Sequence, residues 1–365
     1  MRRSLLDARR IVVKVGTTSL TKANGRLDPK QIDRLVDELC ELAEAGREIV
    51  CVTSGAIAAG LDPLGIVGRP KDMPTLQAAA AVGQSHLMDA YNSAFSSRGR
   101  VCAQVLVTRS DFVHRQQYVN VLNTFRRLLV LGAVPVVNEN DTVAIDEIRF
   151  GENDLLAALV ANLVRADVLV MLSDVDGLHR DDSRDVISTV DEITPEIVRS
   201  AGGSASTLGS GGMRSKLDAV RIATASGVPA VIAGFKRGSL SRILEGKDVG
   251  TMFKPSASKL TSRKAWIGYA TSPKGSVVVD AGARKAIADG NRSLLAAGVK
   301  RVEGTFIPGD AVDIVDDGDG RAFARGLVGF SSDELAKIAG LDSARLKSVI
   351  GDAREVVHRD ELVVL

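Results

Sequence analysis

Short apolar runs alternate with longer amphipathic or alanine-rich runs up to residue 250, and this alternation constrains the fold more than any other feature. Most of the short runs are apolar at every position, which is typical of parallel strands covered on both faces. The pattern predicts an α/β fold in which helices cover a parallel sheet. The predicted strands are residues 11–15, 49–53, 101–107, 134–137, 168–172 and 230–233, and the predicted helices are 30–45, 76–96, 119–131, 154–166 and 213–225.

The character of the sequence changes at residues 254–263, which are rich in Lys, Pro, Ser and Thr and have no apolar period. This composition indicates a linker. The chain has 365 residues, which exceeds the size at which one hydrophobic core usually stops growing, so two domains are expected. After the linker, strands at 276–279, 299–303, 311–315 and 324–327 and a helix at 332–339 favour a small β-rich, barrel-like domain. The predicted organisation is a large domain over 1–258, a linker over 259–275 and a small domain over 276–365.

The composition excludes some functions and favours a soluble, cytoplasmic protein. Hydrophobic residues make up 45% and charged residues 25%, and the net charge of +2 gives no overall field for nucleic acid or membrane. No segment approaches the ~20 apolar residues of a membrane span. Three cysteines, Cys40, Cys51 and Cys102, are an odd number, which favours reduced thiols over a disulfide framework.

Several predicted strands run directly into polar clusters. The first strand is followed by Gly16-Thr17-Thr18-Ser19, the second by Ser54, the fourth by Asn138-Glu139-Asn140-Asp141, and the fifth by Ser173-Asp174. Ligands of open α/β sheets bind outside the carboxyl ends of the strands, so these clusters are expected to line one crevice.

Familiar nucleotide and metal motifs are missing from the sequence. It holds neither a P-loop nor a G-x-G-x-x-G after the first strand, so phosphate must be held in another way. Four scattered histidines without a Cys/His cluster argue against a structural zinc site.

Two lysines stand where an anion could bind. Lys14 lies inside an otherwise apolar strand, where it must reach an anion or extend to water at the strand end. Lys216 follows the glycine-rich segment 209–212 at a helix start, which fits either an anion cradle or a solvent-exposed loop. Taken alone, each segment leaves both interpretations open.

The motifs KVGTTSL, TSGAI, NENDTV, GENDLLA and GSGGMRSK occur in the order seen in glutamate 5-kinases, and the resemblance spans the chain. It implies the three-layer αβα fold of the amino-acid kinase family followed by a PUA-like domain. It also implies ATP-dependent phosphorylation of the γ-carboxylate of L-glutamate, the first step of proline biosynthesis. The sequence departs mildly from the usual family pattern at Ser173 and Glu152, and neither change removes a required functional group.

The resemblance also implies residue roles. Lys14 and Lys216 would act on the phosphoryl group, with Asp154 orienting them. Glutamate would be bound by Ser54, Asp141 and Asn153, with Asn138 as a helper. The positions that match the ATP-binding segments are Lys14, Ser173, Asp174, Ser210, Gly211, Gly212, Met213, Arg214, Ser215 and Lys216.

This chemistry needs no catalytic histidine, because a carboxylate with a pKa near ~4.3 is already ionised at neutral pH. Phosphoryl transfer implies Mg²⁺ with ATP, and no protein ligand is assigned to the metal. The resemblance further implies a homo-oligomer, a dimer or tetramer, and a partner reductase that consumes glutamyl phosphate. The alanine-rich helix 76–96 could pack at an interface between subunits.

Two alternatives remain open from the sequence. Another kinase of the same family would act on aspartate, N-acetylglutamate or carbamate. An RNA-binding accessory protein would use the PUA-like domain, but residues 261–365 hold 15 basic and 15 acidic residues, without the basic excess expected of an RNA-binding face.

Overall fold

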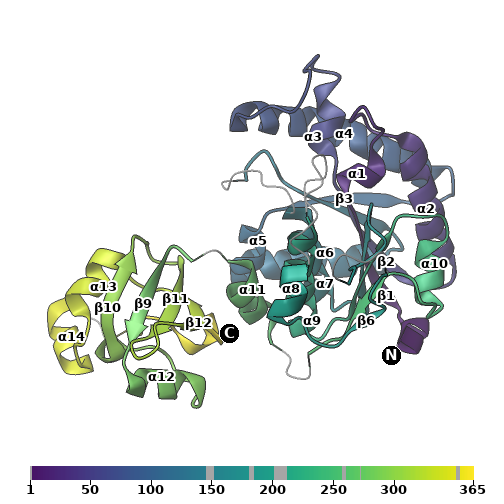
Figure 1. Cartoon of the computed structure of the whole chain (residues 1–365). Helices are drawn as coiled ribbons and strands as arrows, with labels where there is room; N and C mark the ends of the chain where they lie inside the picture. The colour runs from purple at the N-terminus through teal and green to yellow at the C-terminus, as the bar shows by residue number, and fades with distance from the viewer. Residues whose placement is uncertain are drawn as a thin grey trace. The chain divides into compact units, whose positions relative to one another are not determined.

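The structure is a computed structural model that describes residues 2–144, 152–180, 185–200, 212–256, 260–271, 273–350 and 354–365. The chain divides into two compact units, Met1–Lys259 (unit 1) and Leu260–Leu365 (unit 2). Figure 1 shows the elements of each unit. Of the helices that the structure describes, none combines the length and apolar character that a membrane span needs.

Unit 1 is built on a mostly parallel sheet whose described strands follow the order β3-β4-β2-β1-β5-β7-β8-β6. β8 is antiparallel to β7, and the other pairs are parallel. The predicted parallel α/β sheet is therefore confirmed. The strands are β1 Arg10–Val15, β2 Glu48–Val52, β3 Cys102–Val107, β4 Val134–Glu139, β5 Val168–Ser173, β6 Thr189–Val190, β7 Ala230–Gly234 and β8 Thr251–Phe253.

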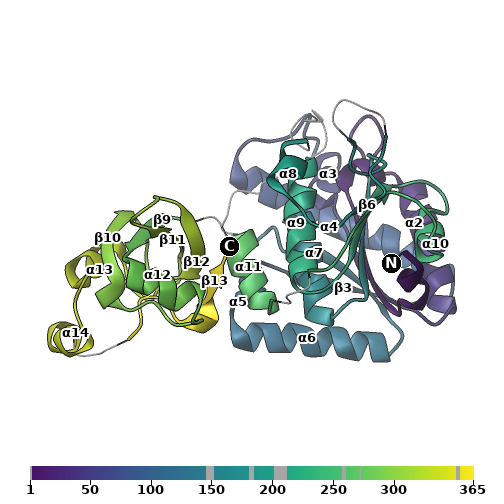
Figure 2. The ribbon, with the colours of Figure 1, turned by 60° about the horizontal axis from the view of Figure 1, so that its bottom comes forward.

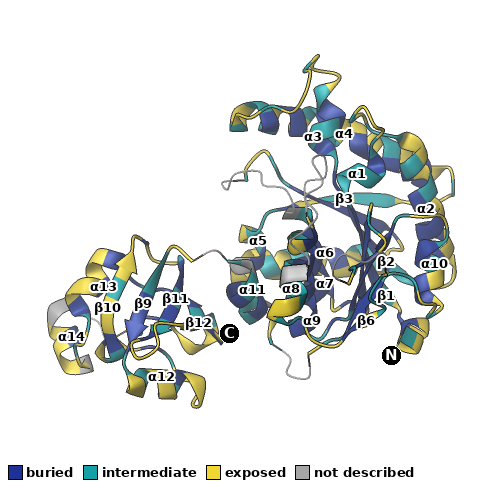
Figure 3. Ribbon diagram, in the orientation of Figure 1, coloured by how far each residue is buried: buried dark blue, intermediate teal, exposed yellow. Residues whose placement is uncertain are grey.

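Helices cover both faces of this sheet, and its central strands, β4, β2, β1, β5 and β7, are almost wholly buried (Figures 2 and 3). Figure 2 shows α7 and α9 on one side of the sheet and α2 and α10 on the other. The helical elements of unit 1 are η1 Arg2–Asp7, α1 Thr17–Leu20, α2 Pro29–Glu44, α3 Ala56–Leu61, α4 Met73–Ser96, α5 Ser110–Val113, α6 Arg115–Val130, α7 Glu152–Val164, α8 Pro195–Ser200, α9 Met213–Ala225 and α10 Ser239–Leu244.

Local sequence explains where the long helices begin. Asp28 and Asp72 cap α2 and α4, since their carboxylates accept hydrogen bonds from the backbone N–H groups of Lys30 and Thr75. A proline lies in the first turn after each cap, where its missing N–H costs no helical hydrogen bond. The five helices predicted for this unit are all present, and α9 has the predicted bounds.

Unit 2 contains a second sheet with the order β10-β9-β11-β12-β13, in which β9 and β11 are parallel and the other pairs antiparallel. The predicted β-rich second part is confirmed. Its elements are α11 Ser262–Ala270, β9 Gly275–Val279, α12 Ala281–Ala288, η3 Ala296–Gly298, β10 Val299–Gly304, β11 Ala311–Asp316, β12 Ala322–Leu327, α13 Ser332–Ile338, α14 Ser343–Ile350, η4 Arg359–Glu361 and β13 Leu362–Val364.

The segment 259–275, predicted as a linker, differs in the structure because it contains α11. Thr261 caps this helix, and its buried Ile267 belongs to a small apolar cluster with Leu327 and Val363. Burial of this side chain attaches α11 to the second sheet. The helix therefore belongs to unit 2.

Candidate active site

The predicted site residues of unit 1 gather at the carboxyl edge of the first sheet. Lys14 lies near the end of β1, Asn138 lies near the end of β4, and Ser173 ends β5. Ser54 lies just beyond β2, and Asp174 follows β5 directly. Because parallel strands point the same way, five side chains from distant parts of the sequence reach one edge of the sheet.

Two lysines share one carboxylate at this edge. Lys14 Nζ lies 2.6 Å from Asp154 Oδ1, and Lys216 Nζ lies 3.6 Å from Asp154 Oδ2. Ser215 Oγ donates a hydrogen bond of 3.0 Å to Asp154 Oδ2. All three charged residues are buried, with exposed fractions of 6% for Lys14, 0% for Asp154 and 6% for Lys216. The group of Lys14, Asp154 and Lys216 is called the charged triad below.

The alternation of side chains along β1 explains how Lys14 enters this triad. Ile11, Val13 and Val15 point into the core cluster shared with α2 and α4. Lys14 therefore points to the opposite face of the sheet, which α7 covers. Asp154 lies in the first turn of α7, where the helix dipole favours a negative charge.

The triad is electrostatically coupled. Burial alone would raise the pKa of Asp154, but the charges of Lys14 and Lys216 and the hydrogen bond from Ser215 hold that pKa below its ordinary value. Burial lowers the pKa of Lys216, and the nearby Lys14 lowers it further, while Asp154 and Asp174 oppose the shift. With both lysines protonated, the triad carries one net positive charge in a poorly solvated place, which suits a polyanionic ligand.

A group of amides and a hydroxyl lies beside the triad. Asn153 Nδ2 donates hydrogen bonds of 3.0 Å to Ser54 Oγ and 3.1 Å to Asn138 Oδ1. Asn138 Nδ2 in turn donates a hydrogen bond of 2.8 Å to Gln84 Oε1. Because Asn153 and Asp154 are neighbours at the start of α7, the amide group and the charged triad belong to one site.

Of the remaining predicted residues, those that the structure describes lie after β4, at the end of β5 and at the start of α9. Asp141 lies in the turn after β4. Burial lowers the pKa of Arg69, and the negative charge of Asp141 partly opposes that shift. Ser173 Oγ donates a hydrogen bond of 2.9 Å to Asp174 Oδ1. Gly212 and Arg214 are exposed at the start of α9, and Met213 is buried there. Ser210 and Gly211 lie outside the described residues.

Sequence reasoning missed Gln84, which the structure joins to Asn138. Its one local signal is a polar side chain directly after Gly83 in a helix otherwise rich in alanine. Ser215 was predicted to bind the nucleotide, and that role stays a prediction; in the structure its hydroxyl donates a hydrogen bond to Asp154.

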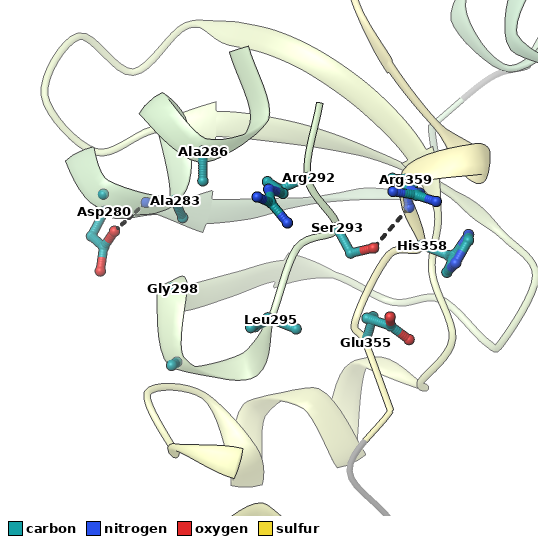
Figure 4. A pocket seen from close by; sticks show the side chains of 12 residues that line it. Asp280, Ala283, Ala286, Arg292, Ser293, Leu295, Gly298, Glu355, His358 and Arg359 are labelled. Atoms are coloured by element: carbon teal, nitrogen blue, oxygen red, sulfur yellow. Dashed lines mark hydrogen bonds between the residues drawn. The ribbon is translucent and has the colours of Figure 1, made fainter. Parts of the chain in front are cut away.

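Two cavities of the described structure are lined by residues other than the predicted ones. A cavity of about 260 Å³ lies beside the ends of β5 and β7, near Asp176 and Lys236. Unit 2 has a cavity of about 730 Å³, where Figure 4 shows Arg292, His358 and Arg359 together with small apolar side chains. Within the ranges that the structure describes, no three His, Cys, Asp or Glu side chains are grouped so as to hold a metal ion.

Comparisons with known proteins show which families the chain matches. The model of the amino acid kinase family matches residues 9–234, and the model of the PUA domain matches residues 275–350. Over 372 residues the chain is 49% identical to the glutamate 5-kinase of Myxococcus xanthus (strain DK1622), covering 100% of this chain and 98% of that protein. It is 46% identical over 374 residues to the glutamate 5-kinase of Geobacter sp. (strain M21), with both chains fully covered.

Among solved structures, the Giardia carbamate kinase superposes with a TM-score of 0.50 at 18% identity. The match covers 68% of this chain and 99% of the carbamate kinase. At this identity the likeness concerns the fold.

Proposed function

The chain belongs to the amino acid kinase family and, within it, to the glutamate 5-kinases, and on this basis we propose which of its residues carry out the reaction. A glutamate 5-kinase phosphorylates glutamate in the first step of proline biosynthesis. An oxygen of the γ-carboxylate attacks the γ-phosphorus of ATP, the bond to the bridging oxygen breaks, and ADP leaves. The products are glutamyl 5-phosphate and ADP.

One observation carries the assignment of catalytic residues: Lys14 and Lys216, 202 positions apart in the sequence, share the carboxylate of Asp154. Two ammonium groups in a poorly solvated site are suited to stabilise the charge on the phosphoryl oxygens during transfer. Asp154 keeps both lysines in place and offsets their mutual repulsion. Since the attacking carboxylate is ionised at neutral pH, no general base is needed.

The amide group is the proposed glutamate site. Ser54 and Asn153, joined by a hydrogen bond, and Asn138 beside them provide hydroxyl and amide groups for the polar ends of the amino acid. Asp141 supplies a carboxylate for the α-ammonium group.

The proposed nucleotide site also adjoins the triad, since Asp174 acts electrostatically on Lys216. Two segments line this site: Ser173 and Asp174 at the end of β5, and Gly212 to Lys216 at the start of α9. Ser210 and Gly211 belong to the second proposed segment. Helix N-termini favour phosphate groups. Magnesium enters as part of the substrate MgATP, and we assign it no protein ligand, because magnesium readily keeps phosphate oxygens and water as its ligands.

Trapping of the acyl phosphate tests this function. The purified protein with MgATP and glutamate should yield a glutamyl hydroxamate when hydroxylamine is added, with ADP formed in proportion. Aspartate, N-acetylglutamate and carbamate serve as competing substrates. A higher kcat/KM for any of these than for glutamate would contradict the assignment.

Replacing Asp141 tests the substrate role of its carboxylate. Asp141→Ala should raise the KM for glutamate at least ~30-fold, because a charge-assisted contact with the α-ammonium group is lost. The KM for ATP should change less than ~3-fold. Equal rises in both constants would refute the assignment, and Asp185→Ala, a change outside the proposed site, is the control.

Three further assignments complete the proposal. The protein is a cytoplasmic homo-oligomer, a dimer or tetramer, and a reductase consumes its unstable product. An apolar surface near the edge strand β3 supports oligomerisation, since Val101, Val130 and Leu131 are 69%, 73% and 63% exposed. Size-exclusion chromatography with light scattering measures the oligomeric state.

A further inference from the structure

Gln84 connects helix α4 to the proposed glutamate site. Its Oε1 accepts the hydrogen bond from Asn138 Nδ2 at 2.8 Å. Asn138 is 2% exposed, so its amide has little access to water and depends on its protein partners. Gln84 is thus the last member of a chain of hydrogen bonds that begins at Ser54.

The hydrogen bonds of this chain run outwards from Asn153. Asn153 donates from Nδ2 to Ser54 Oγ and to Asn138 Oδ1, and Asn138 donates from Nδ2 to Gln84 Oε1. An amide that donates on one side must present its oxygen on the other. The oxygen of Gln84 therefore fixes the orientation of Asn138, and Asn138 fixes that of Asn153.

Two buried amide atoms at this site have no hydrogen-bond partner among the described residues. They are Asn153 Oδ1, an acceptor, and Gln84 Nε2, a donor. Buried polar atoms in native proteins are almost always paired, so each such atom needs an explanation. An acceptor and a donor on one chain of amides match an ammonium group and a carboxylate group of a bound amino acid.

A close helix contact holds Gln84 in position. A Cβ atom on Gly83 would lie 1.8 Å from the carbonyl oxygen of Ala56, and one on Gly60 would lie 1.8 Å from that of Ala79. Without these side chains the backbones of α3 and α4 touch, and Figure 1 shows the two helices side by side. Since α3 begins two residues after Ser54, the same contact fixes both ends of the chain of hydrogen bonds.

Building on the proposed glutamate 5-kinase function, we infer that Gln84 binds the α-carboxylate of glutamate. Its Oε1 orients Asn138, and its Nε2 donates a hydrogen bond to the carboxylate. The γ-carboxylate must face the charged triad, which adjoins Asn153. Gln84 lies two hydrogen bonds beyond Asn153 and therefore meets the other end of the substrate. Gln84 thus becomes a residue that determines specificity for the α-carboxylate.

The substitution Gln84→Glu separates the two roles of the side chain. The new carboxylate keeps an oxygen for Asn138 Nδ2 but replaces the Nε2 donor by an acceptor with negative charge. The substrates are L-glutamate and its α-amide, isoglutamine, whose carboxamide can donate a hydrogen bond to the carboxylate of the variant. The ratio of kcat/KM for glutamate to that for isoglutamine should fall about 100-fold relative to the unmodified enzyme.

The KM for ATP and the melting temperature of the ligand-free protein should stay unchanged in this variant. Gln104→Glu, at a position of β3 away from the proposed site, is the matched control and should leave the ratio unaltered. If turnover by Gln84→Glu is too low to measure, the rise in melting temperature caused by each ligand gives the same comparison. An unchanged ratio overturns the inference, whereas an unmodified enzyme that fails to phosphorylate glutamate would overturn the proposed function instead.

Discussion

The charged groups of the two units are arranged in contrasting ways. In unit 1, Lys14, Asp154 and Lys216 are buried at the edge of the sheet. In unit 2, Lys300 pairs with Asp317 at 2.6 Å while its side chain remains 53% exposed. Lys14 lies at the same distance, 2.6 Å, from Asp154, but water solvates the Lys300–Asp317 pair and is largely excluded from the Lys14–Asp154 pair.

This difference bears on what the charged groups contribute to stability and to ligand binding. An exposed pair gains little because solvent screens it. A buried triad loses the solvation of three ions, so it is a poor way to stabilise a fold. In the function proposed above, its benefit is a fixed positive field for an anionic ligand, and we therefore expect substitutions in the two places to differ sharply in their effects.

The largest effect is expected from removing either lysine of the triad. Lys14→Ala and Lys216→Ala should each lower kcat about 10³-fold, because a preorganised cation no longer stabilises the transferred phosphoryl group. Initial rates of ADP release at saturating substrates measure this. Lys247→Ala, at an exposed position, is the control. Normal turnover in either variant would remove that lysine from the catalytic residues.

Replacing the shared carboxylate should affect both activity and stability. Asp154→Asn leaves two buried ammonium groups without their counter-charge, so kcat should fall about 100-fold and the free energy of unfolding by about 3 kcal/mol. Urea denaturation at pH 7 gives the second value. Since the pKa of Asp154 is lowered in the folded state, its stabilising contribution is present at pH 7, above the ordinary value of 3.8, and is lost as pH falls through the folded pKa. Equal stability of both proteins at pH 7 would mean that the carboxylate does not hold the triad together.

The depressed pKa of Lys216 predicts a loss of activity at high pH. The pKa of Lys216 is lowered from its ordinary value of 10.5. As the pH rises, the ammonium group therefore loses its proton, and with it the positive charge, before pH 10.5 is reached. The kcat/KM for MgATP should then fall about tenfold per pH unit above the shifted pKa. In Lys216→Arg, a guanidinium remains charged, so this decline should disappear. A decline at the same pH in both proteins would assign it to another group.

The smallest effect is expected in unit 2. Lys300→Ala removes a solvent-exposed partner of Asp317, so the melting temperature should change by less than about 2 °C and kcat should not change. Scanning calorimetry at low and high salt checks this. A large fall in melting temperature would show that exposure is a poor guide to the value of an ion pair in this chain.

Much of the first sheet could be predicted from the sequence. Strands such as β1 and β5 are largely apolar runs that end in polar residues, and burial on both faces leaves that pattern in the sequence. β6 and β8, with two and three residues, are too short to show a period. In unit 2, α12 and α14 have eight residues each, about two turns, which is too short to establish a helical period.

The site could be predicted less completely. The polar strand ends indicated its position, but the pairing of Lys14 and Lys216 with Asp154 came from the family resemblance, because no local pattern joins such distant residues. Gln84 was missed because its role depends on how α3 and α4 meet. The helix appeared to be an alanine-rich packing surface, and the contact at Gly60 and Gly83 is a property of the folded backbone.

The distance between the two lysines along the chain determines at which stage of synthesis both are present. A ribosome releases β1 early, whereas α9, which brings Lys216, emerges only after the other elements of the charged triad. Any nascent chain that stops short of α9 can contain Ser54, Asn138 and Asn153 but lacks the second ammonium group. With the proposed role of Lys216, activity begins late in synthesis, and we expect truncated products of translation not to consume ATP by this reaction.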